Sequence, residues 1–328
     1  MTVPHSATAA PRTGSIRDTP FVQDAATGKR VTRWWIAYPL VLLGMIFIVQ
    51  FGIMGVFELT LHPEPGSPEA QWLEIPAGLI PTALIILWVV LFERRHIKTM
   101  GFRRPGRGLL VLLLGIPIGA LMISVPILLL WATGNYRLID PPAGTMGGST
   151  AALLVLVLVL THVVQGGNEE VLIRSFLMQN SALQMPGWLA IVLPALLFTL
   201  MHGVLTKPLG FTTIMMYAIF AAFIVLWQNS LWLIIGIHGG WNWAEGNVWG
   251  VQVDGINVQK TGLIFLEPTE GAPDWVTGGG FGPEGGVVGA ISLIIFAGIA
   301  YLLYRRGRRR TAGAAPATSP PAGAVRES

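Results

Sequence analysis

The chain has 328 residues, of which 52% are hydrophobic and only 12% charged, and its mean hydropathy is +0.62. A soluble domain carries about 25% charged residues, so this composition excludes an ordinary soluble protein and predicts an all-α, polytopic membrane protein. The net charge of +4 does not indicate a nucleic-acid partner, because the basic residues cluster beside apolar segments, where they set membrane topology. The chain contains no cysteine, which excludes disulfides, thiol nucleophiles and thiolate metal sites.

The apolar residues fall into about eight segments, which we interpret as transmembrane helices. Before them, residues 1–33 are polar and lack the apolar core of a removable signal peptide, so we expect a disordered cytoplasmic tail. The membrane domain covers residues 34–304, and residues 305–328, basic and rich in Ala and Pro, are predicted to form a second disordered cytoplasmic tail. The eight segments span approximately residues 35–59, 72–92, 108–131, 149–180, 187–205, 211–228, 231–248 and 285–304.

An even number of spans places both termini on the same side of the membrane, and the basic residues indicate that this side is the cytoplasm. Only four of the 21 Lys and Arg residues then lie elsewhere: Arg137, Lys207 and Lys260 outside, and Arg174 within the membrane. We therefore expect a multi-pass protein of the cell membrane, specifically the bacterial inner membrane.

The fourth segment, residues 149–180, carries three charged side chains: Glu169, Glu170 and Arg174. Each charge in hydrocarbon costs roughly 2.5–3.5 kcal/mol, so intramembrane charges indicate a functional site by default. The structural alternative is an ion pair that locks two helices together. As a helix this segment is about 45 Å long, more than the ~30 Å hydrocarbon core, so it must tilt, protrude or break, and Gly166-Gly167 is a candidate break.

Helical spacing separates the roles of the two glutamates. Glu170 and Arg174 lie four residues apart on one face and can form an ion pair. Glu169 is turned by about 100° from Glu170 and points elsewhere, so its carboxylate is left to face a cavity in the bundle. Such a carboxylate suits the role of a general base.

Two further apolar segments carry histidine. His202 lies in the fifth, while His238 and Asn242 lie four residues apart on one face of the seventh. His202 could instead hydrogen-bond a backbone carbonyl, and the His238–Asn242 pair could simply hold helices together. Tilting would have to bring Glu169 and His202 to the same depth. Small residues on the seventh segment would let a neighbouring helix or a substrate approach closely: Gly236, Gly239 and Gly240.

Two other polar residues lie on similar faces. His162 stands seven residues before Glu169, and we expect it to form hydrogen bonds in the core rather than to act chemically. Glu245 lies one turn beyond Asn242 on its face, and we expect it to be a charge at the membrane interface.

Together these residues form three motifs in a fixed order: Glu-Glu-x-x-x-Arg (169–174), Phe-x-x-x-His (198–202) and His-x-x-x-Asn (238–242). The chain resembles the CPBP family of intramembrane glutamic endopeptidases, the CAAX-protease and bacteriocin-processing group also called Abi proteins. The resemblance covers about residues 149–248, the expected catalytic core. Ile173 replaces an aromatic residue common in the family and Ser175 replaces a common Gly; neither change removes a chemical group.

The resemblance implies an intramembrane endopeptidase. In it Glu169 would activate a water for attack on a peptide carbonyl, and His202 would hold or polarise that water. His238 and Asn242 would donate hydrogen bonds to the oxyanion.

The resemblance also implies supporting residues and a substrate class. Glu170 and Arg174 would support the site, Phe198 would pack beside it, and neither a metal nor a cofactor would be needed. The substrate would be a lipid-anchored, transmembrane or otherwise membrane-associated peptide or protein, and the bilayer the other partner. Eukaryotic relatives act on prenylated C-termini, and bacterial ones are linked to bacteriocin processing and immunity.

The main alternative is a non-enzymatic membrane immunity or chaperone protein, or an ion-coupled transporter, with the same buried polar residues. The sequence lacks the inverted repeats and paired broken helices of many transporters. It also lacks the His-Glu-x-x-His, Gly-x-Gly-Asp and Gly-x-Ser-Gly motifs of other intramembrane proteases.

Overall fold

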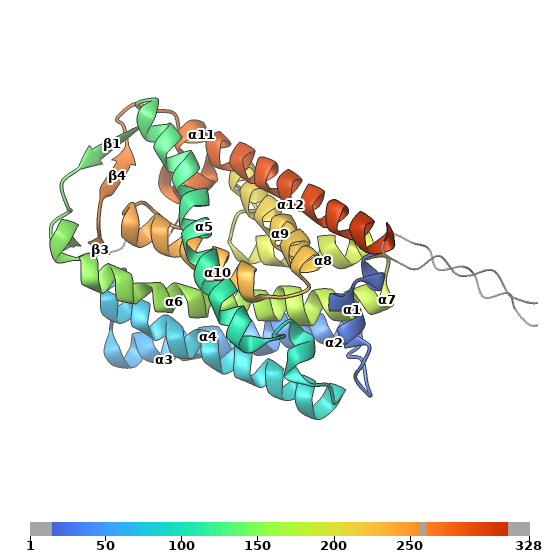
Figure 1. Ribbon diagram of the computed structural model, residues 1–328. Helices are drawn as coiled ribbons and strands as arrows, with labels where there is room; N and C mark the ends of the chain where they lie inside the picture. The colour runs from blue at the N-terminus through green and yellow to red at the C-terminus, as the bar shows by residue number, and fades with distance from the viewer. Residues whose placement is uncertain (1–14, 256–259, 314–328) are drawn as a thin grey trace, which may run out of the picture.

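The protein is a bundle of helices in the computed structural model, which describes residues 15–255 and 260–313 (Figure 1). The predicted all-α, polytopic membrane architecture is confirmed. Two predicted spans are the shorter helices α8 (Gly187–Met201) and α10 (Trp232–Trp243), so the count of eight spans stays a prediction. Six helical segments in the described part of the chain are long and apolar enough to cross a membrane: Trp34–Leu61, Pro68–Glu93, Ile97–Ala132, Ala152–Gln184, Pro208–Gln228 and Val287–Arg310.

The fourth segment is one continuous helix that changes its winding after the glutamates. α6 (Ala152–Glu170) passes Gly166-Gly167 without a break, continues as a π-helical stretch (Val171–Met178) and ends as α7 (Gln179–Gln184). π-Helical turns are frequent at functional sites. The other long segments contain α2 (Trp34–Pro39), α3 (Phe51–Leu61), α4 (Pro68–Trp88), α5 (Pro105–Ala132), α9 (Pro208–Gln228) and α12 (Val287–Gly313).

Helix α10 lies between α5 and α6, and α4 packs on α6 (Figure 1). Gly115 and Gly119 on α5 face Gly236 and Gly240 on α10, each so close to the opposite backbone that a Cβ atom would collide with it. This is the small-xxx-small packing of membrane helices, on both partners at once. The close approach that the glycines of the seventh segment predict is therefore confirmed.

A similar contact sets the position of His238. Gly166 on α6 faces the His238 ring, and Gly239 on α10 faces the backbone of Val163. A side chain at either glycine would push α10 away from α6. The glycines thus bring His238 beside the glutamates of α6.

Short strands cap one end of the bundle, the end opposite α1 and α7 (Figure 1). β1 (Tyr136–Ile139) pairs antiparallel with β4 (Phe265–Pro268), and Arg137 forms an ion pair with Glu267 across them. β2 (Met146–Gly147) pairs in parallel with β3 (Thr261–Gly262). The helix α11 (Asp274–Thr277) belongs to the same end.

The predicted disorder of the two tails is wrong for the residues that lie next to the bundle. The helix α1 (Pro20–Ala25) lies in the predicted N-terminal tail. Its apolar side chains Phe21 and Val22 are completely buried. α12 continues through the arginines to Gly313. The other residues of the predicted tails, 1–14 and 314–328, lie outside the described residues.

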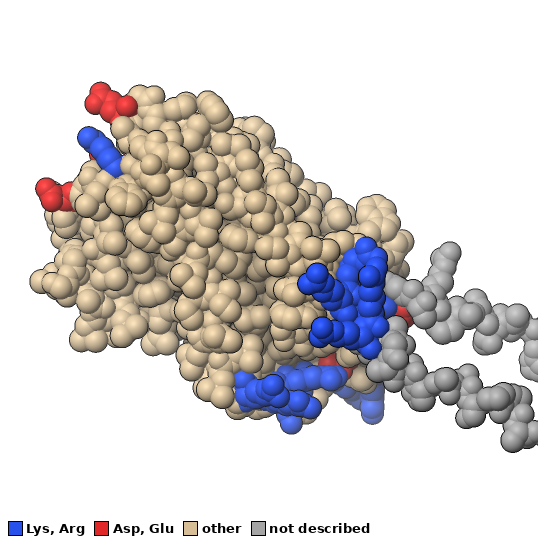
Figure 2. Space-filling model, turned by 45° about the horizontal axis from the view of Figure 1, so that its top comes forward, with Lys and Arg blue, Asp and Glu red and all other residues tan. Residues whose placement is uncertain are grey.

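Most of the Lys and Arg side chains in view lie at the end of the bundle where the described chain begins and ends, and acidic side chains are visible at the opposite end (Figure 2). The positive-inside rule predicts that this basic end is cytoplasmic, and in that orientation the strands β1 to β4 would lie on the outer side of the membrane.

Candidate active site

Glu170 is the buried centre of the polar residues within the bundle. Its side chain is 0% exposed, and Arg174, 2% exposed, approaches it with 3.3 Å between Nε and Oε2. The guanidinium also lies over the Phe198 ring, 4.4 Å from its centroid. A buried carboxylate needs a paired charge, and the four-residue spacing supplies one from the same helical segment, as the sequence predicts.

His238 lies between the two glutamates. Its Nδ1 donates to Glu170 Oε1 at 2.9 Å, and its Nε2 lies 3.7 Å from Glu169 Oε2. When the ring is neutral, the hydrogen bond from Nδ1 leaves Nε2 without a proton, so Nε2 is an acceptor. When the ring is protonated, Nε2 becomes a donor between Glu169 and any group that enters the site.

Glu169 is held by a chain of two amides. Gln165, one turn earlier on α6, donates from Nε2 to Glu169 Oε1 at 2.7 Å. Asn242 donates from Nδ2 to Gln165 Oε1 at 3.0 Å. Glu169 Oε2 is buried and accepts no hydrogen bond from the described residues.

His202 reaches the site from the end of α8. It is the residue that ends the helix, and its Nδ1 donates to the Phe198 carbonyl oxygen at 2.7 Å. Its Nε2 therefore carries the lone pair when the ring is neutral, and this nitrogen lies 3.9 Å from Asp254 Oδ2. His202 therefore forms the hydrogen bond to a backbone carbonyl that the sequence suggests as its alternative role. This bond orients the ring and does not use Nε2.

The structure thus brings Glu169, Glu170, Arg174 and His238 into direct contact and links Asn242 to them through Gln165. His202 adjoins the cluster through Phe198, whose ring centroid lies 4.5 Å from that of His202. The same Phe198 ring lies 6.2 Å from the ring of His238.

A cavity of about 290 Å³ adjoins this cluster. Gln165 and Asn242 form part of its wall, and Asp254, the partner of His202, forms another part. Most of the remaining wall comes from α3, α4 and the loop that joins them, and Thr161, His162 and Val253 complete it. The cavity gives a substrate access to the amide chain that holds Glu169.

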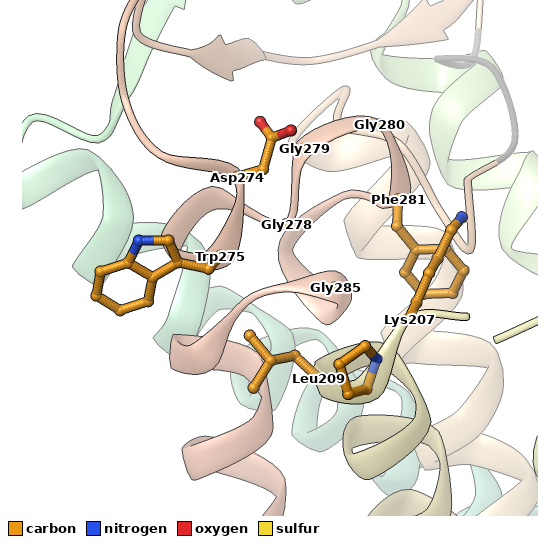
Figure 3. Close-up of a pocket in the computed structure, with 10 residues that line it drawn as sticks. Lys207, Leu209, Asp274, Trp275, Gly278, Gly279, Gly280, Phe281 and Gly285 are labelled. Atoms are coloured by element: carbon orange, nitrogen blue, oxygen red, sulfur yellow. The ribbon is translucent and has the colours of Figure 1, made fainter. Parts of the chain in front are cut away.

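A second pocket, of about 430 Å³, lies at the outer end of α9 (Figure 3). Lys207, Asp274, Trp275 and a glycine-rich turn line it, and Figure 3 shows the Trp275 side chain directed away from Lys207 and Phe281. It contains none of the motif residues, so we place the candidate site in the first cavity.

His162 and Glu245 occupy different environments. His162 Nε2 lies 2.8 Å from Asn247 Oδ1, a hydrogen bond in the core as the sequence predicts. The prediction of an interfacial charge at Glu245 is wrong, since that side chain is 0% exposed. Backbone hydrogen bonds of the following loop, from Leu263 to Asn247 and from Ile264 to Val248, fold the loop over this turn.

Sequence reasoning missed Gln165 and Asp254. Gln165 carried a usable signal, because it is a polar residue in an apolar helix four positions before Glu169. Asp254 carried none, because its contact with His202 depends on how a long outer loop folds back. Among the described residues, no three His, Asp or Glu side chains are grouped to hold a metal ion; a metal-independent reaction stays a prediction.

Comparison with known families agrees with the motifs. Residues 151–244 match the family model described as type II CAAX prenyl endopeptidase Rce1-like. This segment therefore resembles the Rce1-like family. It supplies the glutamates, the arginine, both histidines and Asn242, so the resemblance read from the motifs is confirmed.

The match covers less than a third of the chain, and the cavity wall formed by α3 and α4 lies outside the matched segment. Comparison with curated proteins and with solved structures found no significant match.

Proposed function

We propose that this protein is an intramembrane endopeptidase in which Glu169 activates a water molecule for attack on a peptide bond. The observation that carries the proposal is the state of the Glu169 carboxylate. One oxygen is fixed by Gln165, and the other accepts no hydrogen bond from the described residues at a cluster beside a cavity. A fixed carboxylate with a free oxygen is what a general base requires.

In the reaction, Glu169 takes a proton from the water as its oxygen attacks the carbonyl carbon. His202 Nε2, unprotonated in the neutral ring because Nδ1 donates to Phe198, can accept a hydrogen bond from the second O–H of the same water. The tetrahedral intermediate then collapses, the carbon–nitrogen bond breaks, and the proton held by Glu169 passes to the leaving amine. All atoms of the water and the peptide are accounted for without a further reactant.

The oxyanion is stabilised by hydrogen-bond donors on α10. Asn242 has a second N–H besides the one that it donates to Gln165. His238 can donate from Nε2 when the ring carries both protons, and the carboxylates of Glu170 and Glu169 lie on either side of it. Such donors, fixed before the reaction, contribute most of the stabilisation in acyl transfer.

The substrate in this proposal is a peptide or protein anchored in the membrane by a lipid or a transmembrane helix. The matching family model is described as a CAAX prenyl endopeptidase, and the apolar helices around the cavity support a membrane-anchored substrate here. The bilayer would hold such a substrate at the depth of the site.

The test is peptide hydrolysis by the purified protein in lipid nanodiscs, with a membrane-anchored fluorogenic peptide. Glu169→Gln keeps the shape and should reduce kcat by about 10²–10⁴-fold. Glu270→Gln, on the exposed outer loop, is the matched control and should retain wild-type activity. Equal activity in the Glu169→Gln variant would refute the mechanism, and activity lost only with a chelator would indicate a bound metal instead.

A further inference from the structure

The cavity beside the candidate site opens toward the outer end of the molecule. Its wall includes Pro63, Pro65 and Gly66 from the loop between α3 and α4, and Val253 and Asp254 from the loop after α10. The loop after α10 continues into strands β3 and β4, at the end opposite the termini (Figure 1). Lys and Arg gather at the other, cytoplasmic end (Figure 2).

The wall of this cavity is acidic. Its acidic side chains are Glu58 on α3, Glu74 on α4 and Asp254, and no Lys or Arg is among the residues that line it. Lys260, a cation near this cavity, forms an ion pair with Glu64. A cavity with walls of one charge sign concentrates ligands of the opposite sign.

Gln71, in the same wall, has a side-chain oxygen that no hydrogen-bond donor in the described chain contacts. Gln71 is only 5% exposed; its Nε2 donates to the Gly66 carbonyl, but its Oε1 has no hydrogen-bond partner among the described residues. A buried acceptor without a partner is costly, so a ligand that supplies a donor gains free energy here. The wall therefore offers acceptors for an ammonium or guanidinium group.

We propose that this cavity binds, from the outer side of the membrane, a Lys or Arg side chain of the substrate next to the scissile bond. This inference rests on the proposed endopeptidase function. Ammonium and guanidinium groups have several N–H donors and no acceptor, which matches the carboxylates and the Gln71 oxygen. A substrate that places a free C-terminal carboxylate in the cavity is disfavoured by the same charges.

The first experiment compares three membrane-anchored peptides that differ only at the residue beside the scissile bond: Lys, Gln or Glu. Wild-type protein should cleave the Lys peptide with a kcat/KM about tenfold above that of the Gln peptide, and the Glu peptide most slowly. The double variant Glu58→Gln, Glu74→Gln should lose this preference, while Glu270→Gln should keep it. Equal rates for the three peptides would overturn the inference and leave the endopeptidase function intact.

Binding separates the two proposals. The Glu169→Gln variant should bind the Lys peptide about tenfold more tightly than the Glu peptide, whether or not the wild type cleaves either. Selective binding without cleavage by the wild type would refute the endopeptidase function and keep the cation site. Unselective binding would refute the cation site.

The side of access is tested by cysteine labelling, since the chain has no cysteine of its own. A Met54→Cys variant places a thiol in the cavity wall. In intact cells it should react with a membrane-impermeant maleimide, as Glu270→Cys on the outer loop does, and the Lys peptide should protect it. Lys98→Cys, at the basic end, should react only after the cells are opened. Labelling of the Met54→Cys thiol only in opened cells would overturn the outward orientation.

Discussion

His238 donates from Nδ1 to Glu170 over 2.9 Å, and this contact determines what the other ring nitrogen can do. Nε2 lies 3.7 Å from Glu169 and can donate to a substrate oxygen only when the ring carries both protons. Glu170 is therefore more than a partner of Arg174. It also fixes the orientation of the His238 ring, with Nε2 on the side of Glu169.

A double-variant experiment separates the structural from the chemical role of Glu170. Glu170→Gln leaves the Arg174 charge buried without a counter-charge and should destabilise the fold by roughly 3–5 kcal/mol. Glu170→Gln combined with Arg174→Gln removes both charges and should recover most of that stability, but not the activity. Thermal unfolding in nanodiscs and peptide hydrolysis measure the two effects. Full recovery of activity in the double variant would contradict a role for Glu170 toward His238.

The amide chain from Asn242 through Gln165 to Glu169 should act as one unit. Gln165→Leu removes both of its hydrogen bonds and should lower kcat by about tenfold with a smaller change in KM, because the general base loses its orientation. Asn242→Leu should lower kcat as well. The combined variant should lose less than the product of the two effects, since the variants break a shared link. Independent, multiplicative losses would show that the chain does not transmit orientation.

The sequence could predict contacts between residues that are close in the chain better than contacts between distant segments. The Glu170–Arg174 pair was predictable, because helical spacing alone brings the two side chains together. The close packing of α10 was predictable from Gly236 and Gly240. The π-helical stretch after Glu170 was not, because nothing in the local sequence distinguishes it from an α-helix.

Contacts between distant segments were harder to predict. Asp254 meets His202 across 52 positions of the chain through an outer loop, and Glu245 is buried by that same loop. Neither follows from periodicity, which reports only which face of a helix a residue occupies. The burial of Phe21 and Val22 was missed because a six-residue helix is too short to show a pattern.

Glu284 should make the stability of the fold depend on pH. Burial raises the pKa of Glu284 well above its usual range, and the carboxylates of Glu245 and Asp254 raise it further. The folded state therefore holds a proton that the unfolded chain releases above a pH of about 4.3, so stability falls as the pH rises from there through the raised pKa. Glu284→Gln keeps an acceptor for the Trp241 N–H and removes the proton dependence.

The measurement for Glu284 is the unfolding temperature in nanodiscs at pH about 5 and about 8. The wild type should be less stable at the higher pH, and the loss should be smaller in Glu284→Gln. Glu267→Gln, which changes a partly exposed carboxylate paired with Arg137, is the control and should follow the wild type. If the Glu284→Gln variant kept the full pH dependence of stability, other groups would be its cause.

The packing of α5 against α10 gives the last prediction. A methyl group on Gly236 would overlap the Leu112 carbonyl oxygen, and one at Gly52 on α3 would meet no atom within 4 Å. Gly236→Ala should therefore destabilise the fold by roughly 1–3 kcal/mol through overpacking, while Gly52→Ala should be neutral or stabilise it by up to about 1 kcal/mol. Because α10 also carries His238 and Asn242, Gly236→Ala should lower kcat as well. Wild-type stability and activity in Gly236→Ala would show that the two helices do not need this close approach.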